Sequence, residues 1–148
     1  MNKTQSPFHE DLDFLEVASN GRLSINSDHL SEINYARKGI VLKGVCSLAS
    51  ALKWNIEDIA KVLNTTKKSL TADKSKRLNQ LASESVLDIA RLSNFAVRYF
   101  GNVEDYKHWL NTPHIQFDYH PPQFFIGSII GRKLIKEVIT RSRHGYTA

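Results

Sequence analysis

The longest regular pattern in this 148-residue chain covers residues 80–100, and it restricts the fold to classes that contain a long helix. Apolar residues recur there with the 3.6-residue period of an α-helix. Asn79 is a good N-cap for this run, and Gly101 is suited to end it. A helix of roughly 20 residues is about 30 Å long. We therefore expect one long helix that connects two smaller modules.

Shorter amphipathic runs lie on both sides of the long one, and they are bounded by capping or helix-ending residues. They predict helices over residues 29–37, 41–54, 103–110, 123–129 and 132–143. In the first of these, Leu30, Ile33 and Ala36 form the expected apolar face. Gly44 lies inside the second, where glycine costs up to about 1 kcal/mol relative to alanine, so it should mark a close helix crossing. The predicted fold class is all-α, with residues 1–27 as a weakly patterned N-terminal arm.

Two short helices are predicted to meet at a tight corner between Asn55 and Leu70. Asn55 caps the first together with Asp58, and Thr66 caps the second. Asn64 tolerates the left-handed backbone that is needed to leave the first helix. This arrangement predicts a helix-turn-helix whose second helix presents hydroxyl and lysine side chains to DNA. The alternative is a plain helical hairpin that makes no DNA contact.

Positive charge is concentrated in two segments of a chain whose formal net charge is +5. Residues 61–77 hold six Lys and Arg against Asp73 alone, and residues 132–148 hold five against Glu137 alone. Such a distribution suits a polyanionic partner, although a lysine-rich segment is also the usual form of a solvated face. The residues predicted to contact DNA lie in the first segment: Thr65, Thr66, Lys67, Lys68, Ser69, Thr71 and Lys74.

Several classes of function find no support in these residues. The single cysteine, Cys46, excludes an internal disulfide, and its apolar neighbours favour a buried structural thiol. The spacing of His108, His114 and His120 favours loop histidines over metal ligands. No nucleophile with a base and no glycine-rich phosphate loop is present, so we expect no enzyme activity, cofactor or metal. No apolar run reaches the roughly 20 residues of a membrane span and the N-terminus has no signal-peptide core, so we expect a cytoplasmic protein without a membrane partner.

From Leu30 to Ala148 the order of these features resembles the Xre/MbcA/ParS family of antitoxins. In the first part the resemblance is carried by Arg37-Lys38-Gly39-Ile40, Leu52, Ile59-Ala60, Leu63, Lys68-Ser69-Leu70, Leu78, Ser83-Glu84 and Ala90-Arg91. In the second part it is carried by Phe100-Gly101, Trp109-Leu110, Thr112-Pro113, Pro122, Gly131, Val138 and Gly145. Asn64 stands where the family usually has a glycine.

The resemblance implies an Xre-like helix-turn-helix domain over residues 28–100 and a small helical toxin-binding domain over residues 101–148. It implies that the partner is a RES-domain toxin, encoded beside this protein, which consumes NAD or transfers ADP-ribose from it. The C-terminal domain would cover the active-site cleft of that toxin, while the N-terminal domain would form a homodimer and bind operator DNA. The residues expected to contact the toxin are Trp109, Tyr119, Arg132, Lys136, Arg141, Arg143 and Tyr146.

Other interpretations stay open on sequence alone. A stand-alone dimeric helix-turn-helix regulator would bind a promoter without any toxin encoded nearby. The arginines of the last helix would serve equally well as a solvated face, and Tyr146 would then pack on its own domain.

Overall fold

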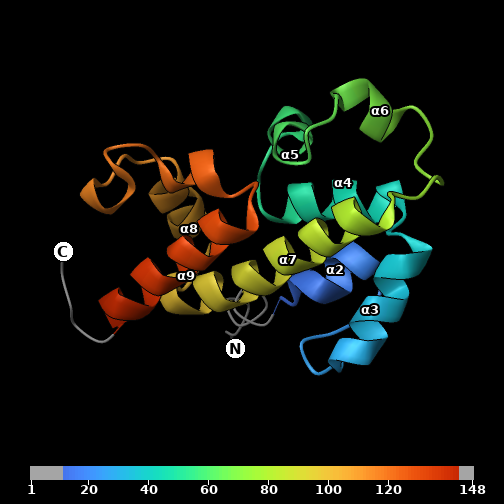
Figure 1. The fold of residues 1–148 in the computed structure, drawn as a ribbon, viewed down its shortest axis with the longest axis horizontal. Coiled ribbons are helices and arrows are strands. Elements are labelled where there is room, and N and C mark those ends of the chain that lie inside the picture. The colour runs from blue at the N-terminus through green and yellow to red at the C-terminus, as the bar shows by residue number, and fades with distance from the viewer. Residues whose placement is uncertain (1–11, 144–148) are drawn as a thin grey trace, which may run out of the picture. The chain divides into compact units, whose positions relative to one another are not determined.

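The computed structural model describes residues 12–143, and these residues form eight α-helices and two short 3₁₀ helices (Figure 1). In chain order they are α2 (Phe14–Ser19), α3 (His29–Lys38), α4 (Leu42–Ala51), α5 (Ile56–Val62), α6 (Lys67–Thr71), α7 (Gln80–Phe100), α8 (Val103–Leu110), η1 (Ile115–Phe117), η2 (Pro122–Phe125) and α9 (Ile129–Arg143). Within this described range there is no β-strand, only two isolated bridges. The predicted all-α fold class and its long helix are confirmed.

The chain divides into two compact units, and the boundary between them lies inside α7. Unit 2 comprises Asp13–Asn94, and unit 1 resumes at Phe95 and continues through α8 and α9. α7 begins where Asn79 Oδ1 accepts the N–H of Ala82 (2.8 Å), as the cap at Asn79 predicted. Gly101, with φ +92°, follows its last residue.

Unit 2 includes α2, a helix within the segment that the sequence left as a weakly patterned arm. Phe14 and Leu15 are buried in the core, and the N–H of Phe14 donates to Asn94 Oδ1 (2.8 Å). The amide of Asn94 in turn donates to Asp13 Oδ1 (3.0 Å). These bonds attach the start of α2 to α7, so residues 13–19 are part of the packed unit.

Gly44 lies where α4 passes α2, and this confirms the predicted close helix crossing. A Cβ atom at this position would collide with the backbone carbonyl of Ala18. Ala18 is itself fully buried, so neither helix has room to move away. The absence of a side chain at Gly44 therefore allows the α2–α4 contact.

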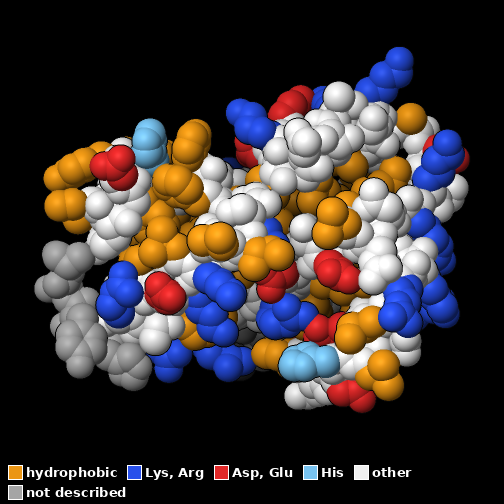
Figure 2. All heavy atoms as spheres, viewed as in Figure 1, with side chains coloured by type: hydrophobic (Ala, Val, Ile, Leu, Met, Phe, Trp, Pro, Cys, Tyr) orange, Lys and Arg blue, Asp and Glu red, His pale blue; other side chains and the backbone are white. Residues whose placement is uncertain are grey.

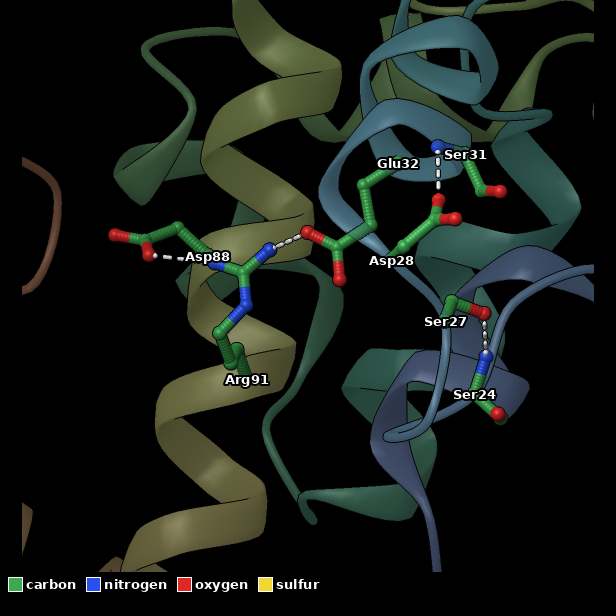
Figure 3. A network of polar contacts seen from close by, with 7 residues as sticks. All are labelled: Ser24, Ser27, Asp28, Ser31, Glu32, Asp88 and Arg91. Carbon is green, nitrogen blue, oxygen red and sulfur yellow. Dashed lines mark hydrogen bonds and ion pairs between the residues drawn. The ribbon is translucent and has the colours of Figure 1, made fainter.

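The apolar face predicted for α3 is wrong at two of its three positions. Ala36 is buried, but Leu30 is 65% exposed and Ile33 is 42% exposed. α3 instead turns Glu32 inward, where its carboxylate pairs with Arg91 of α7 (Figure 3). Because Glu32 and Ala36 are four residues apart, they share the inner face of the helix and leave the two larger apolar side chains in solvent.

The network around this ion pair connects α3, α7 and the loop before α3. Arg91 also pairs with Asp88 one turn earlier on α7 (3.1 Å). Asp28 caps α3 by accepting the N–H of Ser31 (2.7 Å), and this bond lowers the pKa of its carboxyl group. Figure 3 shows the Glu32 side chain reaching from α3 toward Arg91, with Asp28 and Ser31 at the start of the same helix.

Unit 1 contains a continuous series of aromatic contacts. Phe100 of α7 contacts Trp109 of α8 (ring centroids 5.5 Å), and Trp109 contacts His114 and Phe117 (5.2 and 5.9 Å). Phe117 in turn stacks on Phe125 (5.9 Å). The loop between α8 and α9 is therefore packed on the helices and is not a loose connection.

Two predicted helix boundaries in unit 1 are wrong. The helix expected over residues 123–129 is the shorter η2, and α9 begins at Ile129, three residues earlier than predicted. The N–H of Gly131 donates to Ser128 Oγ (2.9 Å), so this serine caps the new start. Gly131 does not open the helix but lies in its first turn, where a Cβ atom would collide with the carbonyl of Phe125.

Candidate functional site

The corner between α5 and α6 has the local geometry that the sequence predicted. Asn55 Oδ1 accepts the N–H of Asp58 (2.8 Å), and the Asp58 carboxylate accepts the N–H of Asn55 (3.3 Å), which completes a capping box. Asn64 leaves α5 with φ +57°, the left-handed conformation expected for it. Thr66 Oγ1 accepts the N–H of Ser69 (3.1 Å) and caps α6. These local predictions are confirmed.

α6 is only five residues long, and packing stabilises it from one side. Leu70 is buried, and its carbonyl accepts a weak hydrogen bond from Cys46 Sγ of α4 (3.7 Å). Cys46 is half-buried, not the fully buried thiol that its neighbours suggested. Its thiol contributes to the contact between α4 and α6.

Most side chains that were predicted to contact DNA already have a partner within α5 and α6. Lys67 pairs with Glu57 (3.2 Å), and the hydroxyls of Thr66 and Thr71 donate to Ser69 Oγ (3.0 Å) and the Lys67 carbonyl (2.9 Å). Lys68 and Lys74 are exposed, while Thr65 is half-buried at the corner. The structure thus brings residues 65–71 together on one short helix and places Lys74 in the loop that follows.

Glu57 modifies the charge of this surface. A hydrogen bond with its own backbone N–H and then the bond with Lys67 hold the pKa of the Glu57 carboxyl below its usual value. The group is therefore ionised at neutral pH. Because both side chains of the pair are exposed, the ion pair contributes little to stability and either partner is available to another charged group.

In unit 1 a set of large apolar side chains is exposed on the segment between α8 and the first turn of α9. Their exposed fractions lie between 60% and 79%. We call this set the apolar surface: Ile115, Tyr119, Phe124, Ile129 and Ile130. Figure 2 shows hydrophobic side chains gathered over the part of the chain that Figure 1 draws between α8 and α9. Residues 115–130 contain one acidic residue, Asp118, and no Lys or Arg. The segment that carries the apolar surface therefore has almost no charged side chains.

The loop that carries Tyr119 has an uncommon backbone. Asp118 and Tyr119 both have positive φ (56° and 65°), although neither is glycine. Such conformations cost about 1 kcal/mol or more each and persist where surrounding bonds impose them. Here the N–H groups of Asp118 and Tyr119 donate to the carbonyls of Ile115 (3.0 Å) and His114 (2.9 Å). The Tyr119 side chain is consequently held out into solvent by a well-bonded turn.

Contacts join the remaining parts of the apolar surface. His120, next to Tyr119, stacks on Phe124 (ring centroids 4.9 Å), and Phe124 contacts Phe125 edge-on (5.1 Å). The Phe125 carbonyl lies against Gly131 in the first turn of α9, beside Ile129 and Ile130. The five exposed side chains therefore belong to one packed segment.

The structure separates the residues that the resemblance assigned to toxin contact. Tyr119 belongs to the apolar surface, whereas Trp109 is half-buried among its aromatic neighbours. Lys136 and Arg143 lie over the ring of Phe95 (5.2 and 5.5 Å), and Arg141 is exposed on α9. Tyr146 lies outside the described residues.

Arg132 does not lie on the outer basic side of α9 that the sequence suggested. It is only 4% exposed and shares the inner stripe with Ile135 and Ile139, three and seven residues later. Its guanidinium donates to the carbonyl of Ile126 (3.0 Å) and so ties α9 to the end of η2. In this conformation the side chain has a structural role, and contact with a toxin stays a prediction.

The histidines of this region are engaged in packing. His114 Nε2 lies 3.1 Å from the Trp109 carbonyl, and His120 stacks on Phe124. Among residues 12–143 no group of three or more His, Cys, Asp or Glu is arranged to hold a metal ion. No helix in the same range is both long and apolar enough to span a bilayer.

Comparison with known families identifies the C-terminal unit. Residues 95–145 match the family described as the antitoxin Xre/MbcA/ParS C-terminal toxin-binding domain. The match begins at Phe95, where unit 1 resumes within α7. This segment is therefore similar to the toxin-binding domain of that antitoxin family. Comparison with curated proteins gave no match.

The family match and the apolar surface fall in the same unit of the chain. The matched family is described as a toxin-binding domain, so residues 95–145 are similar to a segment that acts by binding another protein. Of the apolar surface, sequence reasoning had selected only Tyr119 and had missed Ile115, Phe124, Ile129 and Ile130. The absence of basic residues between positions 115 and 130 was the signal in the sequence, but periodicity does not tell which of these apolar side chains face solvent.

Proposed function

We propose that this antitoxin neutralises a RES-domain toxin encoded beside it, and that unit 1 covers the active-site cleft in which the toxin binds NAD. The toxin would consume NAD or transfer its ADP-ribose, and the bound antitoxin would keep the dinucleotide out. The observation that carries the proposal is the exposed apolar surface on a unit that matches a toxin-binding domain.

The chemistry of the apolar surface suits a protein partner. The centres of protein interfaces are poor in charge and rich in aromatic side chains, and a few buried anchors supply most of the affinity. Tyr119 and Phe124 are anchors of this kind, and each is already oriented by its own turn or stacking partner. Preorganised side chains lose little conformational entropy on binding, which favours a tight complex.

The outer cations of α9 supply the second element of the proposed contact. Lys136, Arg141 and Arg143 are exposed, and Arg143 can form bidentate bonds with a carboxylate. Lys136 and Arg143 are held near Phe95, so their positions are restrained before any partner arrives. We expect these cations to meet acidic groups at the margin of the toxin cleft, while the apolar surface supplies most of the buried area.

The test is co-expression of this antitoxin with the product of the adjacent open reading frame. Phe124→Ser combined with Ile130→Ser should abolish protection of the cells and lower affinity for the purified toxin by at least about 100-fold, since the Phe124 anchor contributes about 2 kcal/mol or more and loss of Ile130 removes further buried apolar area. The matched control is Ile25→Ser with Leu81→Ser, which removes two exposed apolar side chains from unit 2. Full protection by the unit 1 variant, with unchanged affinity, would show that the apolar surface is not the contact.

We propose also that unit 2 forms a homodimer that binds operator DNA and represses its own operon. The corner formed by α5 and α6 supports this role, because α6 exposes Lys68 at its first turn and Lys67 pairs only with an exposed carboxylate. The exposed Leu30 and Ile33 of α3 support self-association. A two-fold dimer would contact half-sites about 34 Å apart, one turn of DNA.

A further inference from the structure

We propose that a basic cluster beside α6 binds the phosphate backbone of duplex DNA. This would be a second DNA contact, in addition to the contact made by α6. The basic cluster consists of Arg37, Lys38, Lys43, Lys74, Lys76 and Arg77. The inference rests on the proposed DNA-binding function of unit 2. It adds a surface that the α5–α6 corner does not contain, with Lys74 as the only shared residue.

Backbone pairing between two distant segments builds the basic cluster. The N–H groups of Leu42 and Lys43 donate to the carbonyls of Lys76 (2.8 Å) and Lys74 (3.0 Å), and the N–H of Leu78 donates to the Ile40 carbonyl (2.8 Å). Val41 and Arg77 form an isolated antiparallel bridge. The connection between α3 and α4 thus lies directly against the loop between α6 and α7.

Gly39 makes this close approach possible. Its φ is +94°, and a Cβ atom there would collide with the carbonyl of Leu78. The guanidinium of Arg77 donates to the Gly39 carbonyl (2.7 Å). Gly39 directly follows Arg37 and Lys38 in the chain, so this bond places the charge of Arg77 close to that segment. Three cations from each segment are consequently brought together although more than thirty residues separate them in the sequence.

The basic cluster is exposed and poorly neutralised. All six side chains are exposed, and no ion pair with a carboxylate is found for any of them among residues 12–143. Asp73 is the one acidic residue in the two segments. Bonds from the Ser75 hydroxyl and N–H, and to a lesser extent the nearby charge of Lys76, lower the pKa of its carboxyl, so Asp73 offsets part of the charge of Lys76. Figure 2 shows Lys and Arg side chains gathered over the region where Figure 1 draws the end of α3 and the α6–α7 loop.

Lysines also lie at the starts of two helices next to the basic cluster. Lys43 lies in the first turn of α4, and Lys67 and Lys68 lie in the first turn of α6. Neither helix has an acidic residue in its first turn. A cation at that end opposes the helix dipole and disfavours folding by a few tenths of a kcal/mol, so stability alone does not explain these lysines.

Continuity with α6 favours duplex DNA as the anion. α4 contacts α6 through Cys46 and Leu70, and Lys74 follows α6 by only three residues. A groove that receives α6 is bordered by phosphates, and these would meet the adjacent basic cluster. Such contacts position a protein on the duplex without reading its sequence, whereas side chains on α6 reach base edges.

The test measures binding of the full antitoxin to a labelled duplex from upstream of its own gene, at several salt concentrations. Lys38→Gln, Lys43→Gln and Lys76→Gln together remove three charges from the basic cluster and leave the bonded Arg77 in place. Each phosphate contact contributes about 0.9 to the slope of log affinity against log salt, so the slope should fall by about 2.7. Between 50 and 200 mM salt, the wild type should then lose about 40-fold more affinity than this variant loses.

The control is Arg22→Gln, Arg98→Gln and Lys133→Gln, which removes the same charge from exposed positions outside the basic cluster. Its slope should equal that of the wild type, and thermal unfolding should show that both variants are folded. The basic-cluster variant should keep the wild-type preference for the operator over a scrambled duplex, whereas Lys68→Gln with Ser69→Ala should lose that preference.

Four outcomes would overturn the proposal. An unchanged slope for the basic-cluster variant, or an equal fall for the control, would leave DNA binding to α6 alone. Stronger displacement by a duplex RNA of the same sequence would assign the basic cluster to RNA. Absence of any operator binding by the wild type would refute both this inference and the proposed DNA-binding function.

Discussion

Single residues decide how closely the elements of this antitoxin approach one another. Gly44 admits the Ala18 carbonyl, Gly39 admits that of Leu78 and Gly131 admits that of Phe125. Arg132 acts in the opposite way, because its buried guanidinium fills a position and satisfies the Ile126 carbonyl. At each of these four positions a backbone carbonyl of a neighbouring segment determines which residue fits: a glycine where the carbonyl needs space, and an arginine where it needs a hydrogen-bond donor.

Gly44→Ala tests this dependence on backbone approach. The substitution raises helix propensity by up to about 1 kcal/mol, but it forces a Cβ atom into the carbonyl of Ala18. We expect a net loss of about 1–3 kcal/mol in the free energy of unfolding, because a buried backbone cannot yield as a side chain does. Urea unfolding measures it, with Ser50→Ala on the exposed face of α4 as the control, expected within about 0.5 kcal/mol of wild type. Equal stability of Gly44→Ala and wild type would mean that α2 moves freely against α4.

At the scale of elements, α6 shows how a very short helix is maintained. Five residues are far fewer than an isolated helix needs in water, so α6 depends on its cap at Thr66 and on the buried Leu70. The proposed DNA contacts lie in the first turn, where the cap acts. Fraying of this turn would therefore weaken DNA binding before it affected the rest of unit 2.

Thr66→Val should expose this dependence. Loss of the hydroxyl removes the acceptor for the Ser69 N–H and costs about 1 kcal/mol locally. Hydrogen exchange at the Ser69 amide should accelerate about 5-fold, and operator affinity should fall, while toxin binding by unit 1 stays unchanged. Thr66→Ser keeps the cap and should behave as the wild type. Wild-type exchange in Thr66→Val would show that the cap does not hold α6.

At the scale of the whole molecule, the two units expose surfaces of different chemistry. Unit 1 exposes an apolar surface with one acidic group, and unit 2 exposes a basic cluster with one acidic group. An apolar surface needs complementary shape and desolvation, whereas a basic cluster acts through phosphate charge and weakens with salt. Toxin binding should consequently be far less sensitive to salt than operator binding.

Self-association is the whole-molecule property that the proposed operator binding requires. Leu30→Lys with Ile33→Lys should convert the dimer to a monomer, because two charges would be placed on the exposed apolar face of α3. Light scattering coupled to size-exclusion chromatography measures the mass. The Phe124→Ser, Ile130→Ser variant is the control and should remain dimeric. If that variant becomes the monomer instead, unit 1 carries the dimer contact.

The sequence determined the features that arise from neighbouring residues. Caps at Asn55, Thr66, Asn79 and Asn102 involve groups only three residues apart, and so they could be predicted together with the helices they begin. The long helix followed from its period, and the toxin-binding family followed from the order of motifs in the last third of the chain.

Only the tertiary structure decided which faces of these helices meet. Glu32 turned inward to Arg91 and left Leu30 and Ile33 in solvent, and Arg132 turned inward to Ile126. The basic cluster joins residues from two segments that no local pattern relates. The physical reason is that capping and periodicity depend on contacts within about one helical turn, whereas ion pairs between helices and loop–loop hydrogen bonds depend on partners that are distant in the chain.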